Sequence, residues 1–350
     1  MKRLIVATVA LLFVPGCAHV AADYILTWGS NGGRPLSKTL DGPGVHLFNR
    51  VAVVRVQDDP PVDLVVWIIE PRPIRAWVET KASANPLADL ADQSLGCAIT
   101  DKASGMMVQL RWERLDLRDS IQPRGTILVL QGQGGCTRIH PKLLPAAVAL
   151  ANDGYRVVMP DLRSQGDSTG KELGFIVKDA QDIGRVLDWL ERERLLAGKV
   201  GILGYSYGAA AGGYVATQDG RVVTCVLAGT PMTWRGLVEH RGSQNLLWRL
   251  MSDATRERTF ERCSERMGYD IDRFDARKLV ASTDKPLLLI HGGKDQNVPV
   301  EQAAAIHRTR PDGIRFVVFE DSGHGDFFLT HADEIRALCL SWFAEHLNTP

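Results

Sequence analysis

Apolar and polar residues follow two different patterns on either side of residue 123. Before it, short β-rich runs lie at residues 51–56, 64–69 and 106–112, separated by Asp-Pro-Pro and glycine-containing breaks. Short runs with turn signals between them are typical of strands. We expect these runs to be the antiparallel opening strands of a sheet.

From Pro123 onward, apolar strands alternate with helical stretches. The predicted strands cover residues 126–130, 155–159, 199–203, 222–228, 286–290 and 314–319, and the predicted helices cover 141–152, 171–196, 300–309 and 332–346. Such alternation is typical of a parallel sheet that helices cover on both faces. The pattern therefore predicts an α/β fold with a mostly parallel, twisted sheet.

Residues 231–284 interrupt this alternation and predict a helical cap over the carboxyl edge of the sheet. The segment is long, helical in propensity and dense in arginine, with Trp234 and Trp248 among its charges. Its arginines either bind a substrate carboxylate or form a solvated helical face, and its tryptophans either line a pocket or form the core of the cap. The arginines in question are Arg235, Arg241, Arg249 and Arg256.

The amino terminus has the pattern of an export signal. Lys2 and Arg3 precede an uncharged apolar run at residues 4–14, which is too short to span a bilayer. Residues 14–17, Val-Pro-Gly-Cys, resemble a bacterial lipobox, with proline in place of the usual small residue. In such a signal the cysteine, here Cys17, is lipidated and becomes the new amino terminus.

The expected order along the chain follows from this signal. Residues 1–17 form the signal peptide, residues 18–48 a tether or irregular lead-in, and residues 49–350 the folded domain. The protein is then exported and held at a membrane by a lipid anchor. A soluble periplasmic or secreted form, cut near residues 21–22, and an uncleaved anchor are the alternatives.

Cysteine usage leaves the disulfide pairing open. Six cysteines are present and five lie beyond Cys17, so at least one of those five thiols stays unpaired. An exported location permits disulfides, and Cys97 and Cys263 are the candidates for them. Cys225 and Cys339 lie in apolar runs, which predicts that both are core residues.

Residues 204–208, Gly-Tyr-Ser-Tyr-Gly, match the Gly-x-Ser-x-Gly nucleophile turn. A predicted strand precedes them and small residues that open a helix follow, which is the context this turn requires. The glycines let neighbouring elements approach a tight strand-to-helix turn that raises the serine hydroxyl above the sheet. Ser206 is therefore the candidate nucleophile, and Tyr205, together with Trp234 of the cap, is a candidate substrate-binding residue.

A serine hydroxyl needs a base, and the base needs an acid that orients it. Asp295 follows the strand at residues 286–290, and His324 follows the last strand. Ser206, Asp295 and His324 thus occur in the chain order Ser, Asp, His. Asp321 and Asp326 are alternatives for the acid, and we expect His291 to stabilise its own loop.

Acyl transfer also needs two donors for the oxyanion of the tetrahedral intermediate. The backbone N–H of Tyr207, directly after the candidate nucleophile, is the first. The second is expected in the loop at residues 131–135, Gln-Gly-Gln-Gly-Gly, where a backbone donor comes from Gln133 or Gly134. Gln131 stands there in place of the histidine that is usual in this loop.

These motifs and the segment at residues 154–168, which looks like a fourth strand and its loop, together resemble the α/β-hydrolase superfamily near its esterase and serine-aminopeptidase-like branches. The resemblance runs from Arg124 to the carboxyl terminus. It implies an α/β-hydrolase fold and a serine hydrolase that cleaves a small-molecule carboxylic ester through an acyl-enzyme. Small peptides or amides and thioesters are the alternative substrates. No metal or organic cofactor is implied.

Other function classes find less support. The charge is balanced, with 41 basic and 41 acidic residues, which argues against nucleic-acid binding. A dinucleotide-binding Gly-x-Gly-x-x-Gly needs a glycine where Thr137 stands. A non-catalytic binding lipoprotein on the same scaffold is the alternative outside enzymes, although its usual mark, a broken triad, is absent. The oligomeric state does not follow from the sequence.

Overall fold

The computed structural model describes residues 17–27, 30, 48–71, 75–82, 96–100, 106–113, 121–135 and 140–347. Residues 1–16 of the predicted signal peptide, the side chain of Cys17 and most of the predicted tether lie outside this description. The lipidation expected at Cys17 therefore stays a prediction.

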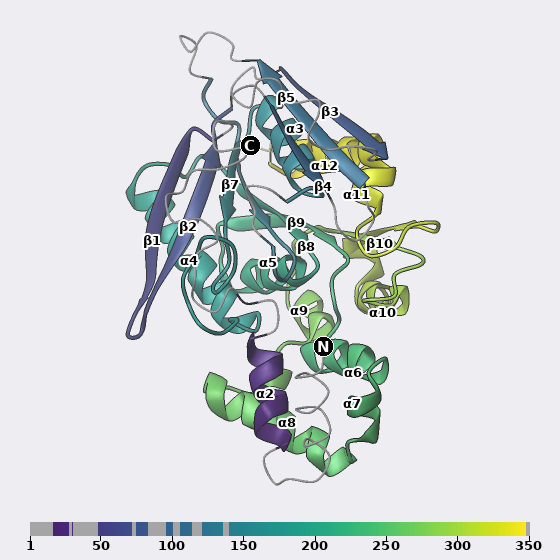
Figure 1. Ribbon diagram of the computed structural model, residues 1–350. Coiled ribbons are helices and arrows are strands. Elements are labelled where there is room, and N and C mark those ends of the chain that lie inside the picture. The colour runs from purple at the N-terminus through teal and green to yellow at the C-terminus, as the bar shows by residue number, and fades with distance from the viewer. Residues whose placement is uncertain are drawn as a thin grey trace.

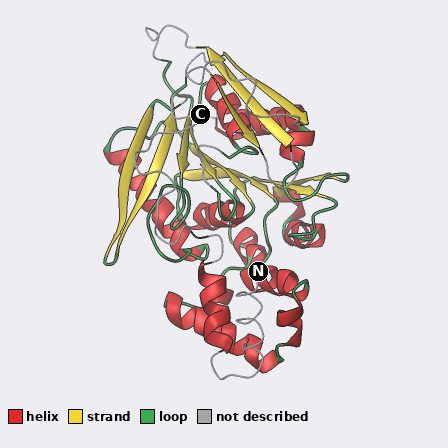
Figure 2. Cartoon of the chain, in the orientation of Figure 1, coloured by secondary structure: helices red, strands yellow, loops and turns green. Residues whose placement is uncertain are grey.

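Within these residues, eight strands form one central sheet (Figures 1 and 2). Their order across the sheet is β1 (Arg50–Asp58), β2 (Pro61–Ile69), β7 (Arg156–Pro160), β6 (Thr126–Leu130), β8 (Val200–Tyr205), β9 (Val222–Ala228), β10 (Leu287–Gly292) and β11 (Ile314–Phe319). β2 pairs antiparallel with β1 and β7, and the pairs from β7 to β11 are parallel. The predicted α/β fold with a mostly parallel sheet is confirmed.

Helices cover both faces of the sheet because its central strands are apolar on both faces. In β6, Leu128 and Leu130 belong to one buried cluster, whereas Ile127 and Val129 belong to the other. The first face packs against α4 (Val177–Arg192), α5 (Tyr207–Gln218) and α10 (Val300–Thr309). The second packs against α3 (Leu144–Asn152), α11 (Phe327–Thr330) and α12 (Ala332–Leu347), and the short η4 (Pro311–Gly313) precedes β11.

A second, three-stranded antiparallel sheet corrects one expectation. Its order is β3 (Arg75–Ala82), β5 (Met106–Glu113) and β4 (Gly96–Thr100). Residues 106–112, expected among the opening strands of the main sheet, belong to this sheet instead. Periodicity indicates extended chain but not its partners, and both partners of β5 lack a continuous apolar run.

The predicted cap segment is helical. It contains α6 (Trp234–Ser243), α7 (Leu246–Leu250), α8 (Asp253–Met267), η3 (Ile271–Arg273) and α9 (Ala276–Ala281). Side-chain caps explain where these helices begin: Thr233 accepts from the N–H of Gly236, and Ser252 accepts from that of Thr255. α6, α7 and α8 lie together at one end of the molecule, beside the amino-terminal helix (Figure 1).

That amino-terminal helix, α2 (Cys17–Thr27), corrects the expectation of a tether or irregular lead-in over its residues. It packs against α8, and Arg266 of α8 binds both Asp23 of α2 and Glu172. Its buried residues recur at helical spacing, namely Ala18, Ala22, Ile25 and Leu26. This apolar stripe is short and continues directly into a glycine- and proline-rich segment, so the sequence around it is not typical of a helix. Among the helices described, none is both long and apolar enough to cross a membrane.

Three cysteines are described with their side chains, and all three are free and buried: Cys225, Cys263 and Cys339. Burial raises the pKa of each thiol to about 12, which makes them unreactive at neutral pH. Cys225 and Cys339 are core residues, as expected, and Cys263 is not in a disulfide. The side chains of Cys97 and Cys136 lie outside the described part.

Candidate active site

Ser206 stands on the turn between β8 and α5 in a strained backbone conformation. Its φ is 52° and its ψ is −115°, which residues other than glycine rarely adopt. The turn is held by hydrogen bonds on both sides, because Ser206 N donates to Ala228 O at 2.7 Å and Ala210 N donates to Ser206 O at 3.1 Å. The turn therefore presents the hydroxyl at the carboxyl end of the central strands.

The two glycines of the motif are required by close contacts. A Cβ atom on Gly204 would lie 2.6 Å from the Cα atom of Ala209, and one on Gly208 would lie 2.4 Å from the carbonyl oxygen of Gln131. Both contacts are with backbone, which cannot move aside as a flexible side chain can. The Gly-x-Ser-x-Gly pattern therefore follows from packing around the turn.

The structure brings the predicted acid and base together with the serine. His324 Nε2 lies 2.9 Å from Ser206 Oγ, and His324 Nδ1 lies 2.6 Å from Asp295 Oδ2. Asp295 follows β10 and His324 follows β11, and these neighbouring parallel strands end at the same edge. Because a carboxylate only accepts hydrogen bonds, Nδ1 carries the proton and Nε2 accepts from the serine hydroxyl.

The Asp295 carboxylate is buried and fully engaged. Its Oδ1 accepts from the N–H groups of Asn297 and Val298, both at 2.9 Å. His291 Nε2 donates to the carbonyl of Val298 at 2.8 Å and lies 3.3 Å from Asp295 Oδ2, so His291 holds this loop. Burial alone would raise the pKa of Asp295, but hydrogen bonds from His291 and His324 outweigh it and hold the pKa well below the usual range.

Two side chains hold the backbone of His324. The Tyr205 hydroxyl donates to the His324 carbonyl at 3.0 Å, and Lys142 Nζ donates to the same oxygen at 2.9 Å. Tyr205, predicted to bind substrate, is buried with its ring 5.2 Å from that of His324, so the observed contacts position the base. Lys142 was missed, because a single lysine before a helix carries no sequence signal.

The predicted oxyanion donors lie on two elements beside Ser206. Tyr207 is the first residue of α5, where a backbone N–H has no acceptor one turn earlier in the helix. In the loop after β6, a Cβ atom on Gly132 would lie 3.4 Å from Ser206 Cβ, so this loop touches the nucleophile. The N–H of Gly134 donates to Gln165 Oε1 at 2.8 Å, and Gln133 stays the predicted second donor.

The alternative acids have other partners. Asp321 lies 3.0 Å from His331 Nε2, and Asp326 lies 3.4 Å from Lys142 Nζ. Among the three candidate acids, Asp295 is the one hydrogen-bonded to His324.

Three of the cap residues predicted as possible substrate contacts are engaged elsewhere. Trp234, predicted to line a pocket, is 1% exposed, and its ring packs edge-on against Phe175 and Tyr207. Trp234 is thus a core residue, because α6, which it begins, packs there against α5. Arg235 binds Glu257 and Asp272, and Arg256 binds Asp253, so both guanidinium groups form surface ion pairs within the cap.

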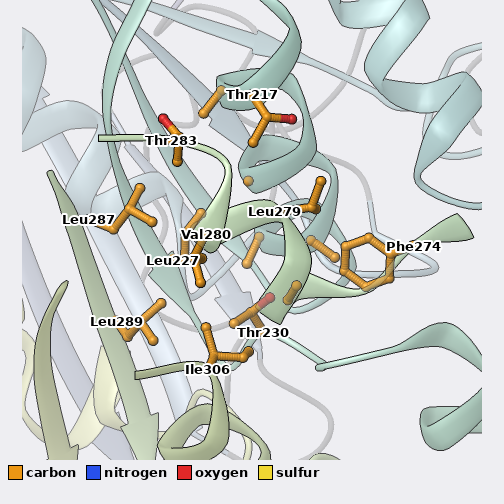
Figure 3. A pocket seen from close by; sticks show the side chains of 15 residues that line it. Thr217, Leu227, Thr230, Phe274, Leu279, Val280, Thr283, Leu287, Leu289 and Ile306 are labelled. Atoms are coloured by element: carbon orange, nitrogen blue, oxygen red, sulfur yellow. The ribbon is translucent and has the colours of Figure 1, made fainter. Parts of the chain in front are cut away.

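A small apolar cavity lies behind the first turn of α5, between α9 and strands β9 and β10 (Figure 3). Its volume of about 20 Å³ suffices for roughly one water molecule. Its lining includes Ala209 and Ala210 but not Ser206, Asp295 or His324. As it stands, this cavity is too small to accept an acyl chain.

The chain is similar to several known proteins. Residues 145–350, more than half of the chain, match the family model described as the prolyl oligopeptidase family. The chain is 39% identical over 79 residues to pimeloyl-(acyl-carrier protein) methyl ester esterase of Neisseria meningitidis serogroup A. These 79 residues are 23% of this chain and 25% of that protein. A serogroup B relative of the same description is 35% identical over 96 residues, or 27% of this chain and 36% of that protein. The chain thus matches only about a quarter to a third of their length.

Solved structures share the fold at low sequence identity. An esterase from Pyrococcus furiosus has a TM-score of 0.60 at 15% identity, over 90% of this chain and 98% of that one. An acylaminoacyl peptidase from Pyrococcus horikoshii has a TM-score of 0.56 at 17% identity, over 86% of this chain and 42% of that one. The folded part of the chain therefore has the α/β-hydrolase fold.

Proposed function

The chain belongs to the prolyl oligopeptidase family and is a hydrolase, and on that premise we propose that it cleaves carboxylic esters through an acyl-enzyme formed on Ser206. The observation that carries the proposal is the continuous hydrogen-bonded path from Ser206 Oγ through His324 to Asp295. The ester-cleaving relatives support the choice of substrate class.

The geometry suits a nucleophilic mechanism. His324 Nε2 takes the Ser206 proton while Oγ attacks the ester carbonyl, and the carbonyl π electrons move onto the oxygen. The resulting imidazolium is stabilised by the ionised Asp295 carboxylate, which lies 2.6 Å from Nδ1. The N–H groups of Tyr207 and Gln133 stabilise the oxyanion.

Collapse of this intermediate breaks the bond to the alcohol, which His324 protonates as it departs. A water molecule then gives its proton to His324 and attacks the acyl-enzyme, and Ser206 Oγ leaves with that proton. The strained turn and the buried Asp295 hold their geometry throughout, so the chain supplies a preorganised site.

The test is stopped-flow turnover of p-nitrophenyl esters of increasing acyl length, with Ser206→Ala beside the native enzyme. We expect a burst of p-nitrophenol equal to the enzyme concentration wherever deacylation is slow, and a loss of more than about a thousandfold in kcat for the variant. A folded Ser206→Ala variant that turns over normally would rule the proposal out.

Amide cleavage is the second candidate, and family membership is the observation that favours it. Amides differ from esters in their leaving group, which must be protonated before it departs. Pairs of p-nitrophenyl ester and p-nitroanilide with one acyl group separate the two activities. A kcat/KM for the anilide within about tenfold of the ester would make this a peptidase or amidase, and the same series with thioesters tests the third substrate class.

We also propose that the protein is exported and lipidated at Cys17. The proposal rests on the charged start, the apolar run and the lipobox-like end of the first 17 residues. Lipid at Cys17 would hold the protein at a membrane surface beside α2. Mass spectrometry of the membrane-extracted protein should show a diacylglycerol-bearing amino terminus that Cys17→Ser lacks. An unmodified amino terminus beyond Cys17 would exclude it.

A further inference from the structure

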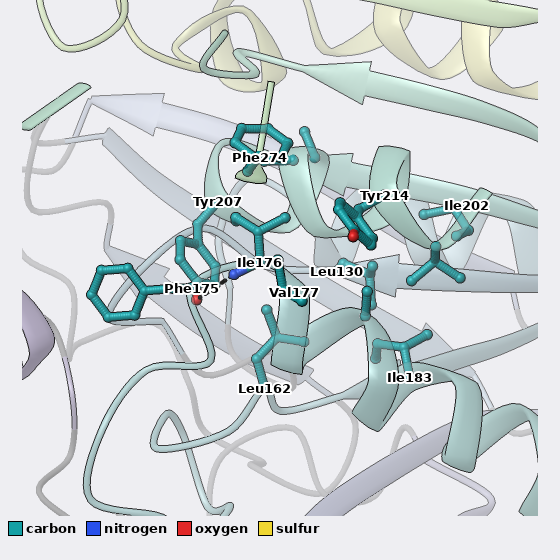
Figure 4. Packing of buried hydrophobic residues seen from close by; sticks show 14 of the residues in the cluster. Leu130, Leu162, Phe175, Ile176, Val177, Ile183, Ile202, Tyr207, Tyr214 and Phe274 are labelled. Carbon is teal, nitrogen blue, oxygen red and sulfur yellow. Dashed lines mark hydrogen bonds between the residues drawn. The ribbon is translucent and has the colours of Figure 1, made fainter. Parts of the chain in front are cut away.

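The residue after Ser206 is anchored in the core by a buried hydrogen bond. Tyr207 is buried, with 1% of its surface exposed. Its ring packs edge-on against Trp234 at 5.6 Å, and its hydroxyl donates to Asp179 Oδ2. Figure 4 shows the tyrosine among apolar residues, with its hydroxyl directed toward the Ile176 backbone.

Asp179 is the centre of a strained turn at the start of α4. Its side chain is fully buried, and Oδ2 also accepts from Ile176 N at 3.0 Å. Phe175 and Ile176 both have positive φ, 46° and 69°, a region that bulky and β-branched residues avoid. A Cβ atom on Gly174 would lie 2.5 Å from the Asp179 carboxyl carbon, so the turn closes tightly around this carboxylate.

No cation binds Asp179 directly among the residues described here, although several charged groups surround it. Arg163 acts on Asp179 through its charge, but both of its hydrogen bonds to carboxylate go to Asp182, at 2.8 Å each. Lys178 precedes Asp179, and Tyr269 donates to the Gly174 carbonyl at 2.6 Å. Burying a carboxylate without a directly bound cation is unfavourable, and hydrogen bonds offset only part of that cost.

We propose that Asp179 is a positioning residue for the oxyanion site, acting through Tyr207. The inference rests on the proposed function, in which the Tyr207 N–H stabilises the oxyanion. The backbone nitrogen and the anchored side chain of Tyr207 are both bonded to the same Cα atom. Fixing the ring through Asp179 therefore resists rotation of the peptide between Ser206 and Tyr207, which the strained Ser206 conformation would otherwise favour.

Variants separate this role from simple packing. Tyr207→Phe keeps the ring and removes the hydroxyl, and Asp179→Ala removes the acceptor. Asp179→Asn keeps an oxygen that accepts from Tyr207 and Ile176 and removes only the charge. We expect the first two to lower kcat for one p-nitrophenyl ester about tenfold with KM within twofold, because loss of alignment affects the transition state. Asp179→Asn should stay within about threefold of the native kcat.

Two controls sharpen the result. The double variant Asp179→Ala/Tyr207→Phe should be no slower than either single variant, because both break the same bond. Tyr269→Phe removes another hydroxyl that donates to the same turn and should leave kcat unchanged. Equal losses in Tyr269→Phe, or native kcat in folded Tyr207→Phe and Asp179→Ala, would overturn the proposal.

The rate of labelling by a fluorophosphonate provides a second readout that needs no ester substrate, since the phosphonyl oxygen also uses the oxyanion donors. Slower labelling of Ser206 in Asp179→Ala and Tyr207→Phe, restored in Asp179→Asn, would support the role. If the native protein is labelled and both variants are labelled equally fast, the positioning role is rejected and the proposed function is not. Absence of labelling in the native protein would reject both this role and the proposed function.

Discussion

Ser206 and its neighbours show how a reactive side chain is held by groups that do not react. The serine backbone lies in a rarely populated region, and bonds from Ala228 and within α5 keep it there. Asp295 has its carboxylate held by two backbone N–H groups and two histidines. At this scale the proposed chemistry depends on the orientation of His324.

Replacing Asp295 by asparagine should lower kcat by roughly a thousandfold to ten-thousandfold. The amide would donate to Nδ1 or leave it without its acceptor, so that His324 adopts the wrong tautomer for taking the serine proton. Steady-state turnover of a p-nitrophenyl ester measures the loss. Asp321→Asn is the matched control and should retain activity within twofold, and a comparable loss there would move the acid to Asp321.

Asp179 should make stability depend on pH. Burial raises its pKa from 3.8 to about 6, although the hydrogen bond from Tyr207 opposes this. Between these values the folded protein binds the proton more tightly than the unfolded chain, so the free energy of unfolding falls as pH rises. The full difference corresponds to roughly 3 kcal/mol.

Urea unfolding of the native protein and Asp179→Asn between about pH 4 and pH 8 measures this effect. Relative to the native protein, the variant should gain about 2–3 kcal/mol as pH rises through this window, because it carries no buried charge. A pH-independent difference between the two would show that Asp179 does not titrate there.

At the scale of elements, the packing of α5 against the loop after β6 determines which residues the nucleophile turn accepts. Gly208→Ala would place a Cβ atom 2.4 Å from the Gln131 carbonyl, whereas a Cβ atom on Gly184, within α4, meets nothing within 4 Å. We expect Gly208→Ala to abolish activity and destabilise the fold. Gly184→Ala should stabilise it by up to about 1 kcal/mol, since alanine favours helix. Thermal unfolding beside ester turnover compares them, and equal effects would contradict the observed packing.

Helix α2 should contribute stability through its apolar stripe. Leu26 is fully buried against the rest of the protein, whereas Val20 on the same helix is 51% exposed. Leu26→Ala should cost about 2–4 kcal/mol of packing and speed proteolysis at α2, and Val20→Ala should change stability by less than about 0.5 kcal/mol. Limited proteolysis and urea unfolding test this pair, and a native-like Leu26→Ala would mean that α2 is not docked in solution.

Elements with a strong local signal could be predicted, and those set by distant partners could not. The strands from β6 onward and the helices after them have apolar runs of clear period, and motif context placed Ser206, Asp295 and His324 at strand ends. In contrast, β3 and β4 lack such runs, and α2 has only a short apolar stripe beside a glycine-rich segment. The sequence leaves both a core role and a pocket-lining role open for Trp234. Lys142, Asp179 and the role of Tyr205 depend on tertiary contacts that leave no local pattern.

At the scale of the whole molecule, the fold supports hydrolysis without selecting the substrate. α/β-Hydrolases share a scaffold and differ in the site built on it. Here the cap joins that site through α6, where His240 Nε2 lies 2.8 Å from the carbonyl of Gln296, next to Asp295. A movement of the cap would therefore be transmitted to the loop that carries Asp295.

The most direct test is intact mass and peptide mapping after treatment with a fluorophosphonate. The proposed mechanism predicts one phosphonyl adduct, located on Ser206, absent from Ser206→Ala and formed at least about a hundredfold more slowly in His324→Gln. An adduct on another residue, or none on the folded native protein, would contradict a nucleophilic Ser206.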